Sequence, residues 1–119
     1  MVAGLDDFFY RRYNRQNYNC AHFVCEVWKH LTGQNIETEL EGFLRPPKDR
    51  RTDPALRRKF KKLAAPVSPC LVLMQRHKSV PHAGVYIRGR IIHIHELGVE
   101  CLPVDVATRG FNKLGYYTC

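Results

Sequence analysis

Apolar residues near the start of the chain recur at intervals of three and four, which is the spacing of one face of a helix. This pattern predicts a short amphipathic helix over residues 5–13 and a longer helix that begins at Cys20 and ends at Gly33. Asn19 is a side chain that commonly caps a helix N-terminus, and glycine commonly ends a helix in the left-handed conformation. We therefore expect Cys20 in the first turn of a helix whose apolar face packs into the core.

The middle of the chain is more polar and its periodicity is weaker. Residues 34–44 predict a weak helical turn, and the two prolines in residues 45–47 interrupt it. Asp53 followed by Pro54 is a favourable helix start, because Asp caps the N-terminus and Pro suits the first helical position. We expect this helix to run to about Leu63 with a strongly basic exposed face.

After Pro66 the apolar runs become short, rich in β-branched residues and bounded by turn residues, which is typical of strands. Arg88 and Gly89 form the strongest hairpin signal, since glycine adopts a positive φ at little cost. The predicted strands are Cys70 to Met74, His82 to Ile87, Arg90 to His95, Val99 to Leu102 and Leu114 to Tyr117. The sequence thus predicts an α+β fold, in which N-terminal helices pack on a C-terminal antiparallel β-sheet.

Length and charge refine this expectation. The 119 residues suit a single domain, 1–119, and no stretch is apolar enough for a membrane span. Residues 45–62 carry nine Lys or Arg and two Asp, so a basic insertion supplies +7 of the net charge of +8. We expect this segment to dock an anionic or protein partner; nucleic acid is disfavoured because no aromatic residues interleave with the charges.

The first ten residues lack the basic region of a signal peptide. We therefore expect a protein made in the cytoplasm that reaches another compartment by lysis, by a dedicated injector or on a larger particle. Five cysteines without a CxxC pair leave at least one thiol unpaired, which directs attention to cysteine chemistry.

Cys20 has the position that a nucleophilic thiol needs. A helix N-terminus offers partial positive charge and free N–H groups, and the backbone N–H of Cys20 or Ala21 is a candidate oxyanion donor. The base is expected to be a histidine, oriented by a third polar group. His82, which follows Pro81 at the start of a predicted strand, is the candidate.

Strand alternation and the two-residue hairpin bring three histidines to one face of the sheet. In that register His95 lies opposite His82, and His93 lies opposite Gly84. Gly84 leaves space between the imidazoles. The alternative is that these are ordinary strand histidines satisfied by their neighbours.

Three strings in this order resemble the NlpC family of papain-like cysteine peptidases, many of which cleave the peptide stems of bacterial cell wall. They are NCAHFVCEVW (residues 19–28), PHAGVYI (81–87) and RIIHI (90–94). The resemblance implies a papain-like, NlpC-type fold with Cys20 as nucleophile, His82 as base and His93 as the orienting residue, with His95 as the alternative third residue. It further implies amide hydrolysis through a thioester, no cofactor, peptidoglycan peptides as substrate, and a setting such as a phage tail or an injected effector in the periplasm.

Other interpretations were weighed against this one. NCAHFV also resembles a string of the lecithin retinol acyltransferase-like enzymes, but their catalytic His precedes the Cys, and residues 1–19 contain no histidine. A zinc site is disfavoured because Cys20 and His22, two apart on a helix, point in different directions; we expect no metal. The remaining alternative is a structural or assembly module, of a phage tail or similar particle, that keeps the papain-like fold and docks other tail proteins through residues 45–62.

Overall fold

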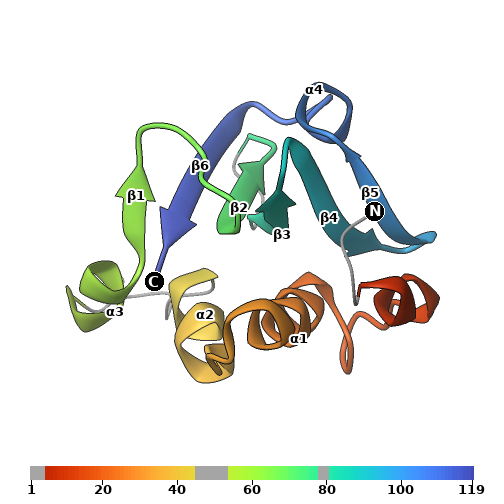
Figure 1. Ribbon diagram of the computed structural model, residues 1–119, viewed down its shortest axis with the longest axis horizontal. Helices are drawn as coiled ribbons and strands as arrows, with labels where there is room; N and C mark the ends of the chain where they lie inside the picture. Colours follow the sequence, from red (N-terminus) through yellow and green to blue (C-terminus); the bar gives the residue numbers. More distant parts are fainter. Residues whose placement is uncertain (1–4, 45–53, 78–80) are drawn as a thin grey trace.

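The computed structural model describes residues 5–44, 54–77 and 81–119, and there helices cover one face of an antiparallel sheet (Figure 1). This arrangement confirms the predicted α+β architecture. The sheet order is β1 (Lys61–Leu63), β6 (Lys113–Thr118), β2 (Cys70–Gln75), β3 (His82–Ile87), β4 (Arg90–His95) and β5 (Gly98–Pro103). The five predicted strands are all present, with ends within one residue of the predicted positions.

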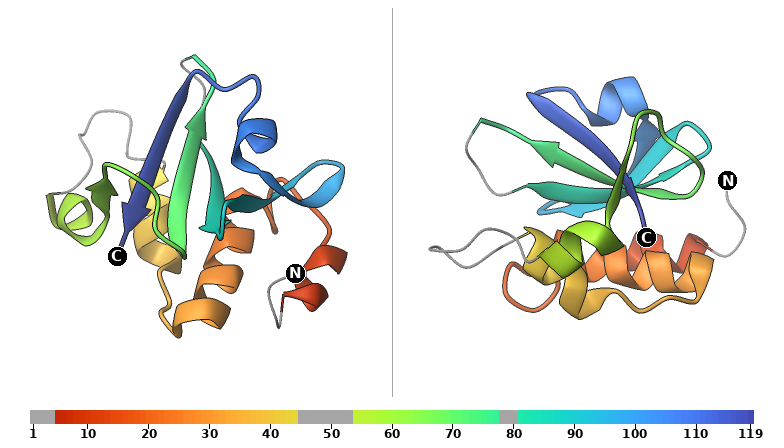
Figure 2. Two further views of the ribbon diagram at one scale, coloured as in Figure 1. Left: turned by 45° about the horizontal axis from the view of Figure 1, so that its top comes forward. Right: turned by 90° about the vertical axis from the view of Figure 1, so that its left-hand side faces the viewer.

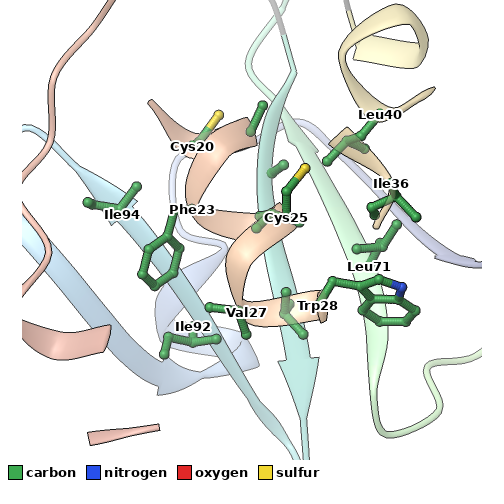
Figure 3. Packing of buried hydrophobic residues seen from close by; sticks show 14 of the residues in the cluster. Cys20, Phe23, Cys25, Val27, Trp28, Ile36, Leu40, Leu71, Ile92 and Ile94 are labelled. Carbon is green, nitrogen blue, oxygen red and sulfur yellow. The ribbon is translucent and has the colours of Figure 1, made fainter. Parts of the chain in front are cut away.

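Helix α1 (Cys20–Thr32) packs across β3 and β4 and builds most of the core. Phe23, Val24 and Val27 are fully buried on its sheet-facing side, which accounts for the spacing of three and four in the sequence. Figure 3 shows Phe23 and Val27 beside Ile92 of β4. Helix α2 (Glu37–Leu44) extends the same layer beneath β2 and β6, as the right-hand view in Figure 2 shows.

A smaller core lies on the opposite face of the sheet, around Val72, Met74, Ile91 and Ala107. The short helix α4 (Val104–Ala107) covers this face next to β4 and β5. The two faces differ along each strand with a period of two, so the even positions of β3 and the odd positions of β4 lie away from α1.

The hairpin between β3 and β4 has the predicted two-residue turn. Arg88 and Gly89 have φ values of 47° and 84°, and Ile87 pairs with Arg90. The register therefore puts His82, His93 and His95 on one face, as the sequence predicts. Gly33, with a φ of 79°, ends α1 as expected.

Two predicted helices are shorter in the structure. The first is a 3₁₀ helix, Asp6–Tyr10, that stops because Arg11 is extended. The third, α3, covers only Pro54–Lys59, and the prediction that it continues to Leu63 is wrong. Residues 61–63 instead form the edge strand β1, which pairs with β6. Phe60, between α3 and β1, is buried at 3% exposure.

The first part of the basic segment, residues 45–53, lies outside the described residues. Its described part is α3 and β1. No helix in the described ranges is long and apolar enough to cross a membrane.

Candidate active site

Cys20 is held in the first turn of α1 by a capping box. The Asn19 side-chain oxygen accepts hydrogen bonds from the N–H of Ala21 at 3.0 Å and of His22 at 3.4 Å. The Asn19 N–H donates to His22 Nδ1 at 3.1 Å, so the cap closes in both directions. This confirms the predicted cap. Figure 3 shows the Cys20 side chain on α1.

The cap separates the two candidate oxyanion donors. The Ala21 N–H already donates to Asn19, whereas the Cys20 N–H makes no hydrogen bond to any described residue. The backbone N–H of Cys20 is therefore the donor that is left for a developing negative charge beside its own sulfur.

Cys20 and His82 line one cavity of about 420 Å³ at the end of the sheet where β3 begins. The N-terminus of α1 approaches this end of the sheet from the face that α1 covers, and His82 is the first residue of β3. No hydrogen bond joins the two side chains in this structure, although a catalytic contact often tightens only when substrate is bound. The remaining lining residues are Tyr13, Asn19, Ile94, His95, Glu96 and Leu97.

The two candidates for the third residue differ in their contacts with His82. His82 Nε2 lies 2.8 Å from His93 Nδ1, and the two rings are nearly perpendicular at 82°. This contact leaves His82 Nδ1 for a thiol proton. Gly84 makes the close approach possible, since a Cβ there would lie 3.3 Å from the Cβ of His93 and 2.8 Å from Ile91 Cγ2.

His95 uses both ring nitrogens elsewhere. Its Nδ1 accepts from the Leu97 N–H at 3.2 Å, and its Nε2 lies 2.8 Å from Glu100 Oε1. His95 thus borders the cavity without engaging His82, whereas the buried His93 makes that contact.

Glu100 is a residue that the sequence analysis missed. It pairs with His93 across β4 and β5, and its second oxygen lies 3.5 Å from His93 Nε2, a buried nitrogen with no hydrogen-bond partner in the described chain. Its position beside His93 could have been predicted from the tight turn after His95, which sets the β4–β5 register. A carboxylate at this position favours a proton on His93 Nε2.

A proton on His93 Nε2 determines the direction of the hydrogen bond between His82 and His93. With its proton on Nε2, His93 accepts at Nδ1, and His82 must donate from Nε2. His82 then carries its lone pair on Nδ1, on the side left free for the thiol. Tyr13, which sequence reasoning did not assign to the site, forms part of the cavity wall.

Both histidines are held neutral at neutral pH. Burial, together with the neighbouring His93 and His95, lowers the pKa of His82 to about 4. Burial likewise lowers the pKa of His93, with Glu100 opposing the change. Burial disfavours an isolated imidazolium, so His82 stays uncharged until it takes a proton from a group, such as the Cys20 thiol, whose resulting negative charge stabilises the charged ring.

The other cysteines are poorer candidates. Burial raises the pKa of Cys25 to about 12 and also raises the pKa values of Cys70, Cys101 and Cys119. Cys25 faces a different cavity of about 300 Å³, beside Tyr18 and Glu26, that contains neither His82 nor His93.

The remaining histidines near α1 have structural contacts. His22 serves the cap, and the ring of His30 packs against Phe8 at a centroid distance of 5.4 Å. Among the residues that the structure describes, no group of three or more His, Cys, Asp or Glu side chains is placed to hold a metal ion. A scan of protein-family models and a search of curated proteins both find no match to the chain.

Proposed function

We propose that the protein is a cysteine hydrolase that cleaves amide bonds of cell-wall peptides through a thioester on Cys20. The observation that carries the proposal is that Cys20 and His82 line one cavity while His82 is hydrogen-bonded to His93. A nucleophile, a base and a group that orients the base are the parts that thiol catalysis requires. They come from α1, β3 and β4, which are tied together by the main core.

The proposed reaction uses these groups in two stages. His82 Nδ1 takes the thiol proton as Cys20 Sγ attacks the carbonyl carbon, and the Cys20 N–H stabilises the oxyanion. The amide C–N bond then breaks, His82 gives the proton to the leaving amine, and a thioester remains. Water, activated by His82, hydrolyses the thioester and restores the thiol.

The substrate class and the NlpC-type identity of the fold have separate support. They rest on the resemblance of residues 19–28, 81–87 and 90–94 to the family strings, together with the chain order of the cysteine and the histidines. A role in a phage tail, or delivery to the periplasm, rests on that resemblance alone.

The test is release of peptides from purified peptidoglycan by wild-type protein and by Cys20→Ala. We expect the variant to release none and to keep its thermal stability within about 1 kcal/mol. Cys101→Ala is the matched control, because Cys101 lies on β5 outside the cavity, and it should retain activity. Equal peptide release by wild-type protein and Cys20→Ala would overturn the proposal.

A second candidate is a docking or assembly module in which catalysis is weak or lost. It is favoured by the absence of a hydrogen bond between Cys20 and His82, and by the exposed cations of α3. Under this alternative, a partner that co-purifies with the chain is lost when Arg57, Arg58 and Lys59 are neutralised together, while Cys20→Ala changes nothing.

A further inference from the structure

A second cavity, of about 350 Å³, extends along β6 from Lys113, at the end of the sheet where β3 begins, to Tyr117, which pairs with Lys62 of β1. Three cationic side chains line it, Arg57, Lys62 and Lys113, and no Asp or Glu among the described residues does. The other lining residues are Phe43, Leu73, Gln75, Pro81, Leu114, Gly115 and Tyr117.

The two cavities flank a single peptide bond. Pro81 lines the cationic cavity and His82 lines the cavity of Cys20, and consecutive Cα atoms are about 3.8 Å apart. The end of β2 and the beginnings of β3 and β6 meet at this end of the sheet, because Gln75 pairs with Lys113 and Met74 pairs with His82. The two cavities are therefore neighbours at the start of β3.

The cationic cavity has a packed aromatic wall. The ring of Tyr117 lies so close over Gly115 that an added Cβ there would be 2.8 Å from the ring. Phe43 packs edge-on against Tyr117 at 5.4 Å, and Phe60 packs against Phe43 at 4.8 Å. This wall is fixed by the core, so the cations stand around a preformed apolar surface.

The three cations are not neutralised by the described part of the protein. No described acid forms an ion pair with Arg57, Lys62 or Lys113, whereas neighbouring Lys59 pairs with Glu39 at 3.5 Å. The cavity of Cys20 has the opposite bias, since Glu96 lines it and no Lys or Arg in the described part of the chain does. The charges of the described residues thus attract an anion to the Pro81 side of His82 rather than to the Cys20 side.

We propose that this cavity is a subsite for a carboxylate group of the substrate peptide. Arg57, Lys62 and Lys113 supply the positive charge that attracts the carboxylate, and the aliphatic part of the same substrate residue packs on Tyr117. Occupation of the subsite orients the peptide so that its scissile bond crosses Cys20. The substrate assignment rests on the proposed hydrolase function, but carboxylate binding is measurable without catalysis.

Strand alternation supplies a matched control. Lys62 lines the cavity while Lys61, the preceding residue of β1, does not, and Arg58 adjoins Arg57 on α3 without lining it. The test variant is Arg57→Gln/Lys62→Gln/Lys113→Gln. The control variant, Arg58→Gln/Lys61→Gln/Arg109→Gln, removes the same charge from exposed positions outside the cavity.

Binding is measured by calorimetry in the Cys20→Ala background, with a synthetic stem tetrapeptide and with the same peptide carrying carboxamides in place of its carboxyl groups. We expect the parent to bind the carboxylate form more tightly, the test variant to lose about tenfold of that affinity, and the control to change less than about twofold. Equal losses in the two variants, no preference of the parent for the carboxylate form, or binding of neither peptide would overturn the subsite.

A parallel turnover assay with wild-type protein separates this proposal from the hydrolase proposal. Carboxylate-dependent binding without cleavage of either peptide would support the subsite and overturn the hydrolase. Cleavage of both peptides at equal kcat/KM, with equal binding, would support the hydrolase and overturn the subsite.

Discussion

Acidification should destabilise the protein through His82. Its pKa is about 4 in the folded protein, against 6.5 in an unfolded chain, because burial and the adjacent His93 and His95 disfavour the charged ring. The folded state therefore binds fewer protons at this site than the unfolded state between these values. The stabilising contribution is complete above pH 6.5 and is lost as the pH falls from 6.5 towards 4. The pKa difference corresponds to roughly 2–3 kcal/mol of unfolding free energy between pH 7.5 and pH 4.5.

The assay is urea unfolding of wild-type protein and His82→Gln at these two pH values. Wild-type protein should lose roughly 2–3 kcal/mol more than the variant, which has no imidazole to protonate at this position. His30→Gln is the control, since His30 is exposed, and it should keep the wild-type pH dependence. If wild-type protein and His82→Gln lose the same free energy, the inference that His82 is neutral and buried is wrong.

Three further predictions concern the groups around the site. Glu100→Gln removes the charge beside His93 and His95, and should lower kcat about tenfold with little change in KM, measured on a stem peptide; an unchanged kcat would contradict a positioning role. Gly84→Ala should cost about 2 kcal/mol in chemical denaturation, because its Cβ meets a β4 side chain at 2.8 Å; wild-type stability would contradict the close packing. Asn19→Ala should cost about 1 kcal/mol by the same method, whereas no loss would mean that the cap is dispensable.

Much of the fold is predictable because local and long-range preferences agree. Asn19 and Gly33 are favourable ends for α1, and the apolar spacing between them matches the buried face that packs on β3 and β4. Arg88 and Gly89 fix the hairpin, so strand parity alone brings His82 and His93 to the same face.

The errors occur where tertiary contacts outweigh local preference. Residues 61–63 follow a good helical segment and are rich in Lys, yet they pair with β6, and Phe60 is buried where the chain changes direction. An edge strand with few apolar residues gives no periodic signal of its own. Its partner lies more than fifty residues away in the sequence, beyond the reach of pattern analysis.

The site could be predicted in part for the same reason. The cysteine and histidines follow from helix and strand starts, but the choice between His93 and His95 depended on side-chain contacts that register alone does not fix. Glu100, on the neighbouring strand β5, places a carboxylate beside both histidines. The hydrogen bond from the Ala21 N–H to Asn19 depends on the geometry of the cap. The first effect comes from two strands that become neighbours only in the folded chain, and the second from the local geometry at the start of α1.

The central claim is that Cys20, His82 and His93 act as one unit, and cysteine alkylation near pH 6 tests it most directly. Wild-type protein, His82→Gln and His95→Gln are treated with limiting iodoacetamide, and mass spectrometry gives the labelling rate of each cysteine. We predict that Cys20 reacts at least about tenfold faster than the other four, that His82→Gln removes this advantage, and that His95→Gln retains it. Uniformly slow labelling of all five cysteines in wild-type protein would contradict the claim.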